Sequence, residues 1–299
     1  MLFDSNVFTV IPTLFKDDNE VDYDSIMSHI QKQKTAGIET IVLLGTTSET
    51  PTLSFKEQLE IVQTVWDSFH TDLNIVVGVG GFNTVVVRVK LSEFKDMCHG
   101  FMISTPYYNK PTQEGLYTHF ASLVVTVPEH PIILYNVPSR TGVNMLPSTT
   151  VKLYNDFENV KAIKEASGSL DQVSELLTNC DIIVLSGDDS LTLPMLSIGA
   201  HGCVSVASNV YPEKLISMVN LFKSGNVKES SLIHKQLYRV FKLMFIETNP
   251  SPLKYFMYKY SLHTNYDVRL PLMKLSEVGM MKINYYLSSC SLECSTQEI

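Results

Sequence analysis

IILYNVP at residues 132–138 and VKAIKEASG at residues 160–168 are the two stretches that decide the fold. Each is a short run of mostly apolar and β-branched residues, as in buried strands, and each runs into a proline or a glycine. If the two runs are neighbouring parallel strands, Tyr135 and Lys164 end at the same level of one sheet. The pattern therefore predicts an amine and a phenol side by side at one edge of the sheet.

The same layout recurs along the chain and predicts a closed barrel. Short β-rich runs alternate with segments of helical pattern, and each strand-plus-helix unit spans roughly 20 to 35 residues. Such alternation is typical of an α/β fold of the parallel (β/α)8 (TIM) barrel type, which we predict here with a C-terminal helical extension. The expected strands are residues 7–11, 40–44, 75–79, 100–104, 132–136, 161–164, 182–186 and 203–206.

The segment between the second and third expected strands has a clear helical pattern. Ser54 and Glu57 form a capping-box pair at its start. Apolar residues then recur at helical spacing, which predicts that they pack into the core: Phe55, Leu59, Val62, Trp66 and Phe69. Residues 83–97 are less clear, because the valines at 85–87 have low helix propensity, and only the alternation predicts a helix there.

The chain is expected to divide into two regions. Residues 1–224 would form the catalytic barrel, and residues 225–299 would form a C-terminal helical region. Proline-containing breaks at residues 249–252 and 270–271 separate the expected helices of that second region.

The composition excludes several classes of protein. With 44% hydrophobic residues in 299, the chain can bury a large core. Its 23 basic residues against 31 acidic ones give a formal charge of -8, so we expect no broad basic surface for nucleic acid or anionic lipid. Any anionic ligand must therefore be held by local groups.

The cysteines favour free thiols in a reducing compartment. They show no Cys-x-x-Cys pair, which also argues against a metal site; they are Cys98, Cys180, Cys203, Cys290 and Cys294. We expect no metal and no cofactor. No segment approaches about 18 uninterrupted apolar residues, and residues 1–6 carry no basic leader, so we expect a cytoplasmic protein that does not associate with membranes.

Polar groups gather where expected strands end, which is where reactive groups lie in such barrels. The second strand runs into GTTSE at residues 45–49, whose hydroxyls and backbone N–H groups can converge on a carboxylate. The fourth runs into TPYYNKP at residues 105–111, and the fifth gives Tyr135 and then Arg140. The sixth ends in Lys164, and an amine nucleophile beside a phenolic proton carrier indicates Schiff-base chemistry.

Each of these groups also has a structural explanation when it is considered alone. A lysine near a strand end is usually a solvated charge, a tyrosine is usually a core aromatic, and Arg140 would be an ordinary surface ion-pair partner. The turn at residues 45–47 would be an ordinary connection between strand and helix. Their joint placement at successive strand ends is much less expected by chance and favours an active site.

At these residues the chain resembles the dihydrodipicolinate synthase family. The matching motifs follow the order of the family over nearly the whole chain: GTT at 45–47, TPYYNKP at 105–111, YNVPSRTG at 135–142, IKEASG at 163–168, SGDD at 186–189 and ETNP at 247–250. The resemblance implies a lyase of lysine and diaminopimelate biosynthesis. Such an enzyme condenses pyruvate with L-aspartate 4-semialdehyde to give 4-hydroxy-tetrahydrodipicolinate.

The resemblance also implies a role for each matching residue. Lys164 would attack C2 of pyruvate to form the imine, and Tyr135 would relay protons with Thr46 and Tyr108 as hydrogen-bonded partners. Tyr108 would reach in from a neighbouring subunit, so we expect a homo-oligomer, either a dimer or a tetramer of tight dimers. The pyruvate site would include Thr47, Gly187 and the carbonyl of Val204, and Arg140 would hold the carboxylate of the aldehyde.

The chain departs from the family pattern at two places. Ser48 stands where the family has the second glycine of Gly-Thr-Thr-Gly-Glu, so the turn must accept a side chain. The lysine feedback site of the bacterial enzymes uses histidines and acidic or amide groups. The matching positions here are Phe55, Gln58, Phe82 and Val86, which predicts that this site is absent.

Two alternative functions remain open from the sequence. Related pyruvate-dependent aldolases, such as N-acetylneuraminate lyase and 2-keto-3-deoxy-sugar acid aldolases, share the lysine, the tyrosine and the Gly-[Ser/Thr]-Thr turn. They generally lack an arginine at the position of Arg140 and the Thr-Pro-Tyr-Tyr-Asn context, which favours the synthase. The other alternative is a catalytically silent barrel that acts as a binding protein, although every catalytic position carries the expected residue.

Overall fold

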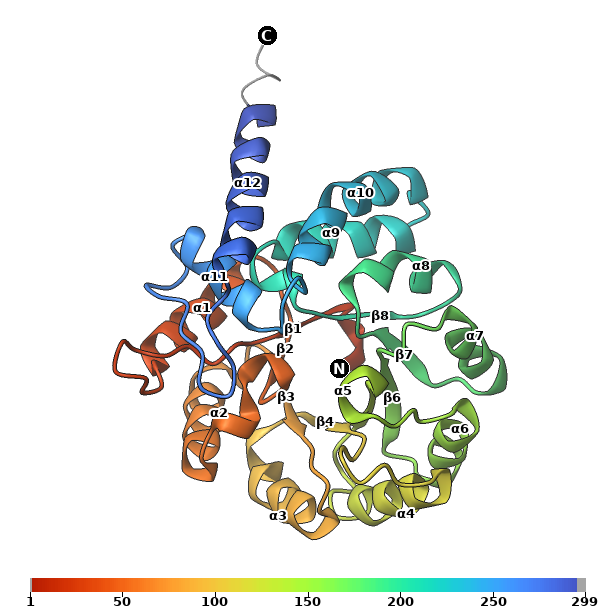
Figure 1. Cartoon of the computed structure of the whole chain (residues 1–299). Helices are drawn as coiled ribbons and strands as arrows, with labels where there is room; N and C mark the ends of the chain where they lie inside the picture. Colours follow the sequence, from red (N-terminus) through yellow and green to blue (C-terminus); the bar gives the residue numbers. More distant parts are fainter. Residues whose placement is uncertain (1, 295–299) are drawn as a thin grey trace.

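Parallel strands close into a barrel in chain order, from β1 to β8 (Figure 1). This computed structural model describes residues 2–294, and the side chains up to residue 289. The strands lie within one residue, at each end, of the positions expected from the sequence, and the predicted barrel is confirmed. They are β1 (Val7–Val10), β2 (Thr40–Leu43), β3 (Asn74–Val79), β4 (Gly100–Ser104), β5 (Ile132–Asn136), β6 (Val160–Glu165), β7 (Ile183–Ser186) and β8 (Gly202–Ser205).

Helices surround the barrel and connect its strands (Figure 1). They are α1 (Tyr23–Thr35), α2 (Phe55–Phe69), α3 (Thr84–Phe94), α4 (Gln113–Val124), α6 (Pro147–Asp156), α7 (Leu170–Asn179), α8 (Thr192–Ser197) and α9 (Pro212–Lys223). The short helix α5 (Pro138–Thr141) follows β5 directly at the barrel mouth. The strands are buried on both faces, which explains why they read as continuous apolar runs rather than alternating ones.

The first turn of α2 was predicted correctly, but its buried face was predicted only in part, since Val62 and Phe69 are buried as expected. Ser54 and Glu57 form the expected capping box, in which each side chain accepts from the other's backbone N–H. The fully buried residues of this helix are Gln58, Ile61, Val62, Val65 and Phe69. Leu59 and Trp66 are only partly buried, and Phe55 is 38% exposed, because the core-facing stripe is rotated relative to the expected one.

Helix α3 forms in spite of its three consecutive valines. The side chain of Asn83 caps it by accepting from the N–H groups of Val85 and Val86 at 3.0 and 3.4 Å. Only one face is buried, through Val87, Leu91 and Phe94, and the opposite face leaves Val85, Val86 and Val89 exposed. These exposed valines form an apolar surface that this subunit does not cover.

Three further helices follow the barrel: α10 (Val227–Leu243), α11 (Ser251–Lys259) and α12 (Glu277–Cys294). Helix α10 packs against α9, and the boundary expected near residue 224 falls between these two helices. Helix α11 contacts the short 3-10 helix after β8 and the helix α12, and Figure 1 shows α12 projecting away from the barrel. Residues 295–299, the end of the expected C-terminal region, lie outside the described residues.

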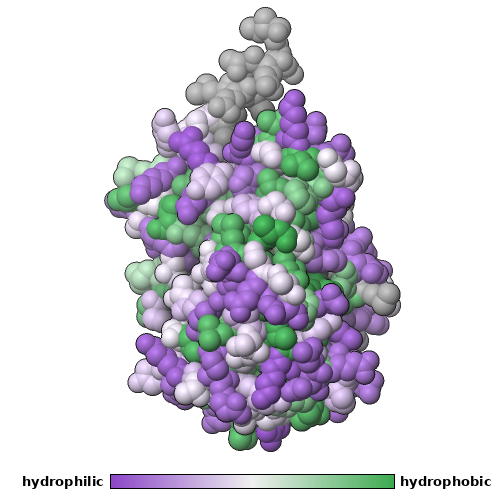
Figure 2. Space-filling view, turned by 90° about the vertical axis from the view of Figure 1, so that its right-hand side faces the viewer, coloured by the Kyte–Doolittle hydropathy of each residue, from purple (hydrophilic) through white to green (hydrophobic). Residues whose placement is uncertain are grey.

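The side of the molecule that carries α7 is mostly hydrophilic (Figure 2). Hydrophobic side chains appear on it in scattered groups, which is ordinary for a protein surface. Among the described residues, no helix is long and apolar enough to cross a membrane.

Candidate active site

Lys164 and Tyr135 lie side by side, as the sequence predicted. They are paired in the register of β5 and β6, and both side chains are buried. The Nζ atom of Lys164 lies 4.2 Å from the centre of the Tyr135 ring. An amine held against an aromatic ring and shielded from water is placed for nucleophilic chemistry, with a phenol next to it for proton transfer.

Gly187 makes room for the Lys164 side chain. A Cβ atom at this position would lie 3.0 Å from Cε and 3.1 Å from Cγ of Lys164, and 2.7 Å from Cβ of Ala166. These distances are shorter than ordinary van der Waals contact, so only glycine fits without movement. The glycine that the resemblance assigned to the substrate site therefore also sets the position of the lysine.

A buried polar network fixes the ends of β5 and β6 to each other. Glu165, directly after Lys164, accepts from the side chain of Asn136 at 3.2 and 3.1 Å. It also accepts from Gln172 at 2.9 Å and from the backbone N–H of Ser167 at 2.7 Å. Every partner is a neutral donor, so the carboxylate is satisfied by hydrogen bonds alone. This network holds the strand ends that carry Tyr135 and Lys164.

Val204 lies in β8, with only 1% of its surface exposed. The chain after β8 is tied to the chain after β7, because Asp189 accepts from the backbone N–H groups of Val206 and Ala207 at 3.1 and 2.9 Å. Burial of this carboxyl raises its pKa above the ordinary value. Gly187, directly after β7, and Val204, in β8, therefore belong to two neighbouring strand ends that the Asp189 carboxylate holds together.

The turn after β2 accepts Ser48 without strain. The left-handed residues of this segment are Leu44 and Glu49, both with φ of 54°, and Ser48 is not among them. The Ser48 hydroxyl donates to the carbonyl of Ile11 at 2.6 Å, and its own carbonyl accepts from the Thr13 hydroxyl at 2.7 Å. Through its hydroxyl, a serine at this position therefore gains one hydrogen bond to the segment after β1, to Ile11, that a glycine would lack.

The two threonines of the same turn differ in their surroundings. Thr46 lines the cavity described below, together with Tyr135. Thr47 is only 2% exposed, and its hydroxyl oxygen accepts from the Asn249 side chain at 2.9 Å. Sequence reasoning missed this contact. The only available signal was the ETNP motif at residues 247–250, which carried no role for Asn249.

Arg140 is exposed at the mouth of the barrel and lines the same cavity. It belongs to α5, whose C-cap residue, Gly142, has the left-handed conformation with φ of 73°. Within the described side chains, no carboxylate forms an ion pair with Arg140. Its guanidinium is therefore available for an anionic ligand.

The paired tyrosines after β4 take different positions. Tyr107 packs edge-on against Phe82, with ring centres 5.3 Å apart, and lines the cavity. Tyr108 has a positive φ of 68° and is 85% exposed. Of the residues predicted for the proton relay, Tyr108 is therefore the one that this subunit does not bring to its own site.

The cavity has a volume of about 610 Å3 and opens at the carboxyl end of the barrel. Three of the predicted site residues line it directly: Thr46, Tyr135 and Arg140. Five others do not form part of its lining: Tyr108, Lys164, Thr47, Val204 and Gly187. Of these, Lys164, Thr47 and Val204 are buried and Gly187 is half-buried.

Phe55, Gln58 and Lys90 also line this cavity. The ammonium of Lys90 donates to the Gln58 side-chain oxygen at 3.1 Å. Partial burial lowers the pKa of Lys90 below its ordinary value. Sequence reasoning identified Phe55 and Gln58 but not Lys90, which has the pattern of an ordinary polar residue on a helix.

Glu49 and Lys254 form an ion pair below the turn after β2. Their side chains are 0% and 1% exposed, and Nζ lies 2.5 Å from the carboxylate. Burial lowers the pKa of Lys254 to about 8, while the negative charge of Glu49 acts in the opposite direction. Residues separated by 205 positions gave no local sequence signal for this contact.

No group of three or more histidine, cysteine or acidic side chains that could hold a metal ion occurs among the residues the structure describes. The polar groups at the barrel mouth are instead an amine, hydroxyls, amides and a guanidinium. That set can bind carboxylates and form an imine with a ketone.

Comparison with known proteins is consistent with this geometry. Residues 4–289 match the model of the dihydrodipicolinate synthetase family. A 4-hydroxy-tetrahydrodipicolinate synthase from Endomicrobium trichonymphae is 40% identical over 290 residues, covering 96% of this chain and 99% of that protein. One from Azobacteroides pseudotrichonymphae genomovar. CFP2 is 44% identical over 274 residues, covering 91% and 92%.

Solved structures agree in fold as well as in sequence. A crystal structure of DHDPS from Cyanidioschyzon merolae with lysine bound has a TM-score of 0.93 and 32% identity, covering 98% of this chain and all of that one (100%). The likeness therefore extends over the barrel and the C-terminal helices together. With the family match across almost its full length, the chain belongs to the dihydrodipicolinate synthetase family.

Proposed function

We propose that this protein is a 4-hydroxy-tetrahydrodipicolinate synthase, a lyase that condenses pyruvate with L-aspartate 4-semialdehyde in lysine and diaminopimelate biosynthesis. The observation that carries the proposal is the register pair of Lys164 and Tyr135, because Tyr135 lines a cavity that Arg140 also lines. The relatives that carry this activity in their names support it over almost the whole chain.

Lys164 is the proposed nucleophile. Its amine adds to C2 of pyruvate and water leaves, which gives an imine. Loss of a proton from the pyruvate methyl group converts the imine to an enamine, whose carbon attacks the aldehyde carbon of the second substrate. The amino group of that substrate then adds to C2 and displaces Lys164, so the ring closes and the free enzyme returns. Pyruvate and the aldehyde together lose one water in the net reaction.

Proton transfers in these steps are assigned to Tyr135. Its phenol lies beside the amine, and Thr46 lines the same cavity. Carbinolamine dehydration and enamine formation each need a positioned acid or base, and a hydroxyl chain can serve for both. The carboxylate of pyruvate is assigned to the turn that carries Thr47, and Gly187, directly after β7, and Val204, in β8, are assigned to the same substrate site.

Arg140 is assigned to the carboxylate of L-aspartate 4-semialdehyde. It lines the cavity together with Thr46 and Tyr135, and no carboxylate forms an ion pair with it among the described side chains. A guanidinium binds a carboxylate through two parallel hydrogen bonds, which fixes the orientation of the aldehyde. This residue therefore favours the synthase over aldolases that act on uncharged sugar-derived aldehydes.

A homodimer is proposed as the smallest active unit. Tyr108 is 85% exposed and lies apart from the cavity of its own subunit. Nearby, Phe82, Val85, Val86 and Val89 leave 51% or more of their surfaces exposed. A second copy that covers this apolar surface would bring Tyr108 to the neighbouring site. Pairing of dimers into tetramers remains an expectation from the resemblance.

We also propose a cytoplasmic location. Cys98, Cys180 and Cys203 are free within the described part of the chain. Burial raises the pKa of the Cys98 thiol to about 12 and that of Cys180 above its ordinary value, so both thiols stay protonated at neutral pH. Unpaired thiols of this kind are typical of proteins in reducing compartments.

The proposed function is tested by two assays on the wild-type protein. Borohydride reduction in the presence of pyruvate should add the mass of the reduced adduct to the peptide that contains Lys164. A coupled assay should show turnover with pyruvate and L-aspartate 4-semialdehyde, and none in the cleavage of N-acetylneuraminate. Trapping at another lysine would refute the nucleophile, and preferred cleavage of N-acetylneuraminate would refute the substrate.

A further inference from the structure

The turn after β2 holds a backbone conformation that needs external support. Leu44 and Glu49 bracket it with φ of 54° each, a left-handed conformation that residues with a Cβ seldom adopt. Inside the turn, the backbone N–H groups of Ser48 and Glu49 donate to the carbonyls of Gly45 and Thr46, both at 3.1 Å. Residues in strained conformations persist when their surroundings hold them from several directions.

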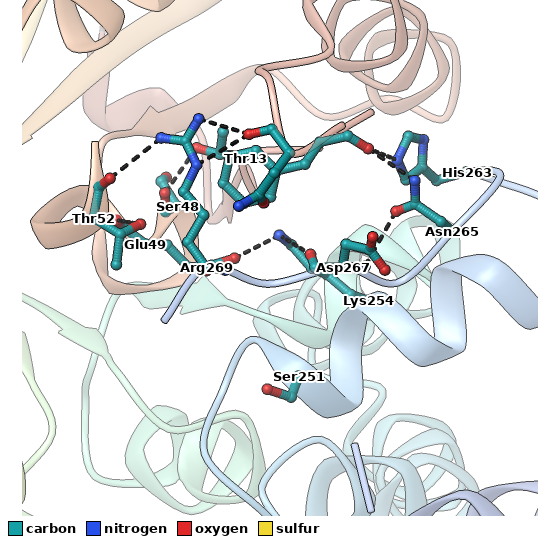
Figure 3. A network of polar contacts seen from close by, with 12 residues as sticks. Thr13, Ser48, Glu49, Thr52, Ser251, Lys254, His263, Asn265, Asp267 and Arg269 are labelled. Carbon is teal, nitrogen blue, oxygen red and sulfur yellow. Dashed lines mark hydrogen bonds and ion pairs between the residues drawn. The ribbon is translucent and has the colours of Figure 1, made fainter. Parts of the chain in front are cut away.

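The surrounding support for Glu49 comes from the C-terminal region. One carboxylate oxygen binds the ammonium of Lys254 at 2.5 Å, and the other accepts from the backbone N–H of Arg269 at 3.0 Å. Lys254 also donates to the carbonyl of Asp267 at 2.7 Å and lies 4.2 Å from the centre of the Phe15 ring. Figure 3 shows these side chains between the turn and the segment that leads from α11 to residue 269.

Arg269 extends the same support past the turn. Its guanidinium donates to the carbonyl of Thr52 at 3.2 Å and to the Glu57 carboxylate at 2.7 Å (Figure 3 shows the contact with Thr52). A second pair of hydrogen bonds reaches the carbonyl of Asn19 at 3.2 and 2.8 Å. The whole stretch from the turn to the first turn of α2 is therefore attached to one C-terminal segment.

Asn249 contacts a side chain of the turn itself. Its side-chain nitrogen donates to the Thr47 hydroxyl oxygen at 2.9 Å, and both residues are buried. Because an amide N–H can only donate, the Thr47 oxygen is the acceptor in this bond, and its own proton must point in another direction. The Thr47 hydroxyl is thereby set as a donor, which is the role that a substrate carboxylate requires.

We propose that Asn249 and the Glu49–Lys254 ion pair are positioning residues of the active site. Asn249 sets the direction in which the Thr47 hydroxyl donates, and the ion pair holds the backbone that carries Thr46 and Thr47. This inference rests on the proposed function for the role of the turn in binding pyruvate. The contacts that hold the turn do not depend on that function. The C-terminal helical region therefore contributes to the active site through the turn that it holds.

The first test is a double-mutant cycle on pyruvate imine formation. Asn249→Ala and Thr47→Val should each raise the pyruvate concentration for half-maximal trapping on Lys164 by about tenfold, as when a hydrogen bond to a charged group is lost. The double variant should be no worse than either single variant, because both act through one hydroxyl. If the losses of the two single variants add in the double variant, the proposed role of Asn249 is overturned, because a residue that only stabilises the fold would act independently of Thr47.

The second test removes the ion pair without leaving an uncompensated buried charge. Glu49→Gln combined with Lys254→Met should accelerate hydrogen–deuterium exchange in the peptide that contains residues 44–53 by about tenfold or more and leave the strands of the barrel unchanged. The matched control is Lys34→Met with Asp72→Asn. That pair has the same 2.5 Å separation but lies on the surface, and its loss should change neither exchange in the turn nor trapping.

The two readouts separate the inference from the proposed function. If the wild-type protein traps no pyruvate on Lys164, the proposed function is refuted, and the exchange experiment still decides whether the ion pair holds the turn. Unchanged exchange at residues 44–53 in the Glu49→Gln, Lys254→Met variant would overturn the ion pair's positioning role, whatever the activity. Faster exchange throughout the barrel would overturn it as well, because the pair would then be a general element of stability.

Discussion

Replacing Gly187 by alanine should displace the Lys164 amine without unfolding the barrel. The new Cβ would lie 3.0 Å from Cε of Lys164, where ordinary contact begins at 3.4 Å, so the lysine must retreat by 3.4 - 3.0, or about 0.4 Å. The contact with Cβ of Ala166 is shorter still, at 2.7 Å. Because Ala166 belongs to the chain directly after β6, its movement also shifts the strand end that carries Lys164.

The magnitude follows from this displacement. A misplacement of about 1 Å in a reacting group can cost roughly a hundredfold in rate, so a shift near half of that is expected to cost about tenfold. One inserted methyl group in a packed site costs about 1 to 3 kcal/mol of stability, which a chain of this size tolerates. We therefore expect a folded protein whose imine formation with pyruvate is slowed by about tenfold or more.

The assay is the rate of borohydride-trapped pyruvate adduct under single-turnover conditions, with thermal unfolding measured in parallel. Gly225→Ala is the control, since its φ of 86° makes alanine unfavourable while no atom lies within 4 Å of the new Cβ. It should lose about 1 kcal/mol of stability and keep its trapping rate. A Gly187→Ala protein that traps pyruvate at the wild-type rate would show that Lys164 has more freedom than its packing indicates.

Four other outcomes are expected. Tyr135→Phe should fold normally and lose turnover by roughly 10² or more, because it removes only a proton carrier; near wild-type kcat would contradict the relay. Arg140→Ala should impair use of L-aspartate 4-semialdehyde by about 1.5 to 3 kcal/mol while pyruvate trapping persists, and equal losses in both steps would contradict its assignment to the aldehyde. Activity should be insensitive to lysine, because Phe55, Phe82 and Val86 cannot bind its polar groups and the Lys90 ammonium repels another amine; inhibition well below millimolar lysine would contradict this. Burial lowers the pKa of His29 from 6.5 to about 4. Its contribution to the free energy of unfolding is therefore fully present above about pH 6.5 and falls by about 3 kcal/mol as the pH drops toward 4. Urea unfolding at pH 7 and pH 4.5 should show this fall in the wild type and not in His29→Gln, and an equal fall in both proteins would contradict it.

The sequence determined the barrel and the centre of its site. Strand and helix patterns are local properties of the chain, so eight β-rich runs and the helical segments between them could be located from residue types alone. Once β5 and β6 are parallel neighbours, the pairing of Tyr135 with Lys164 follows from counting along the strands, and the structure has that register. The motifs also located Thr46 and Arg140, because the carboxyl ends of barrel strands converge on one cavity.

The tertiary structure decided which distant residues hold the site. In the sequence, Lys254 has the pattern of an ordinary polar residue in a helical segment. Only the fold brings it into contact with Glu49, which lies 205 positions away in the chain. Asn249 reaches Thr47 in the same way, and the α2 stripe turns Phe55 toward the cavity instead of the core. A buried charge or amide is tolerated only when a partner satisfies it. Because these partners lie far away in the chain, the residues next to Lys254 or Asn249 carry no signal for the contact. Local pattern placed Tyr135 and Lys164, and long-range packing holds the turn that carries Thr46 and Thr47.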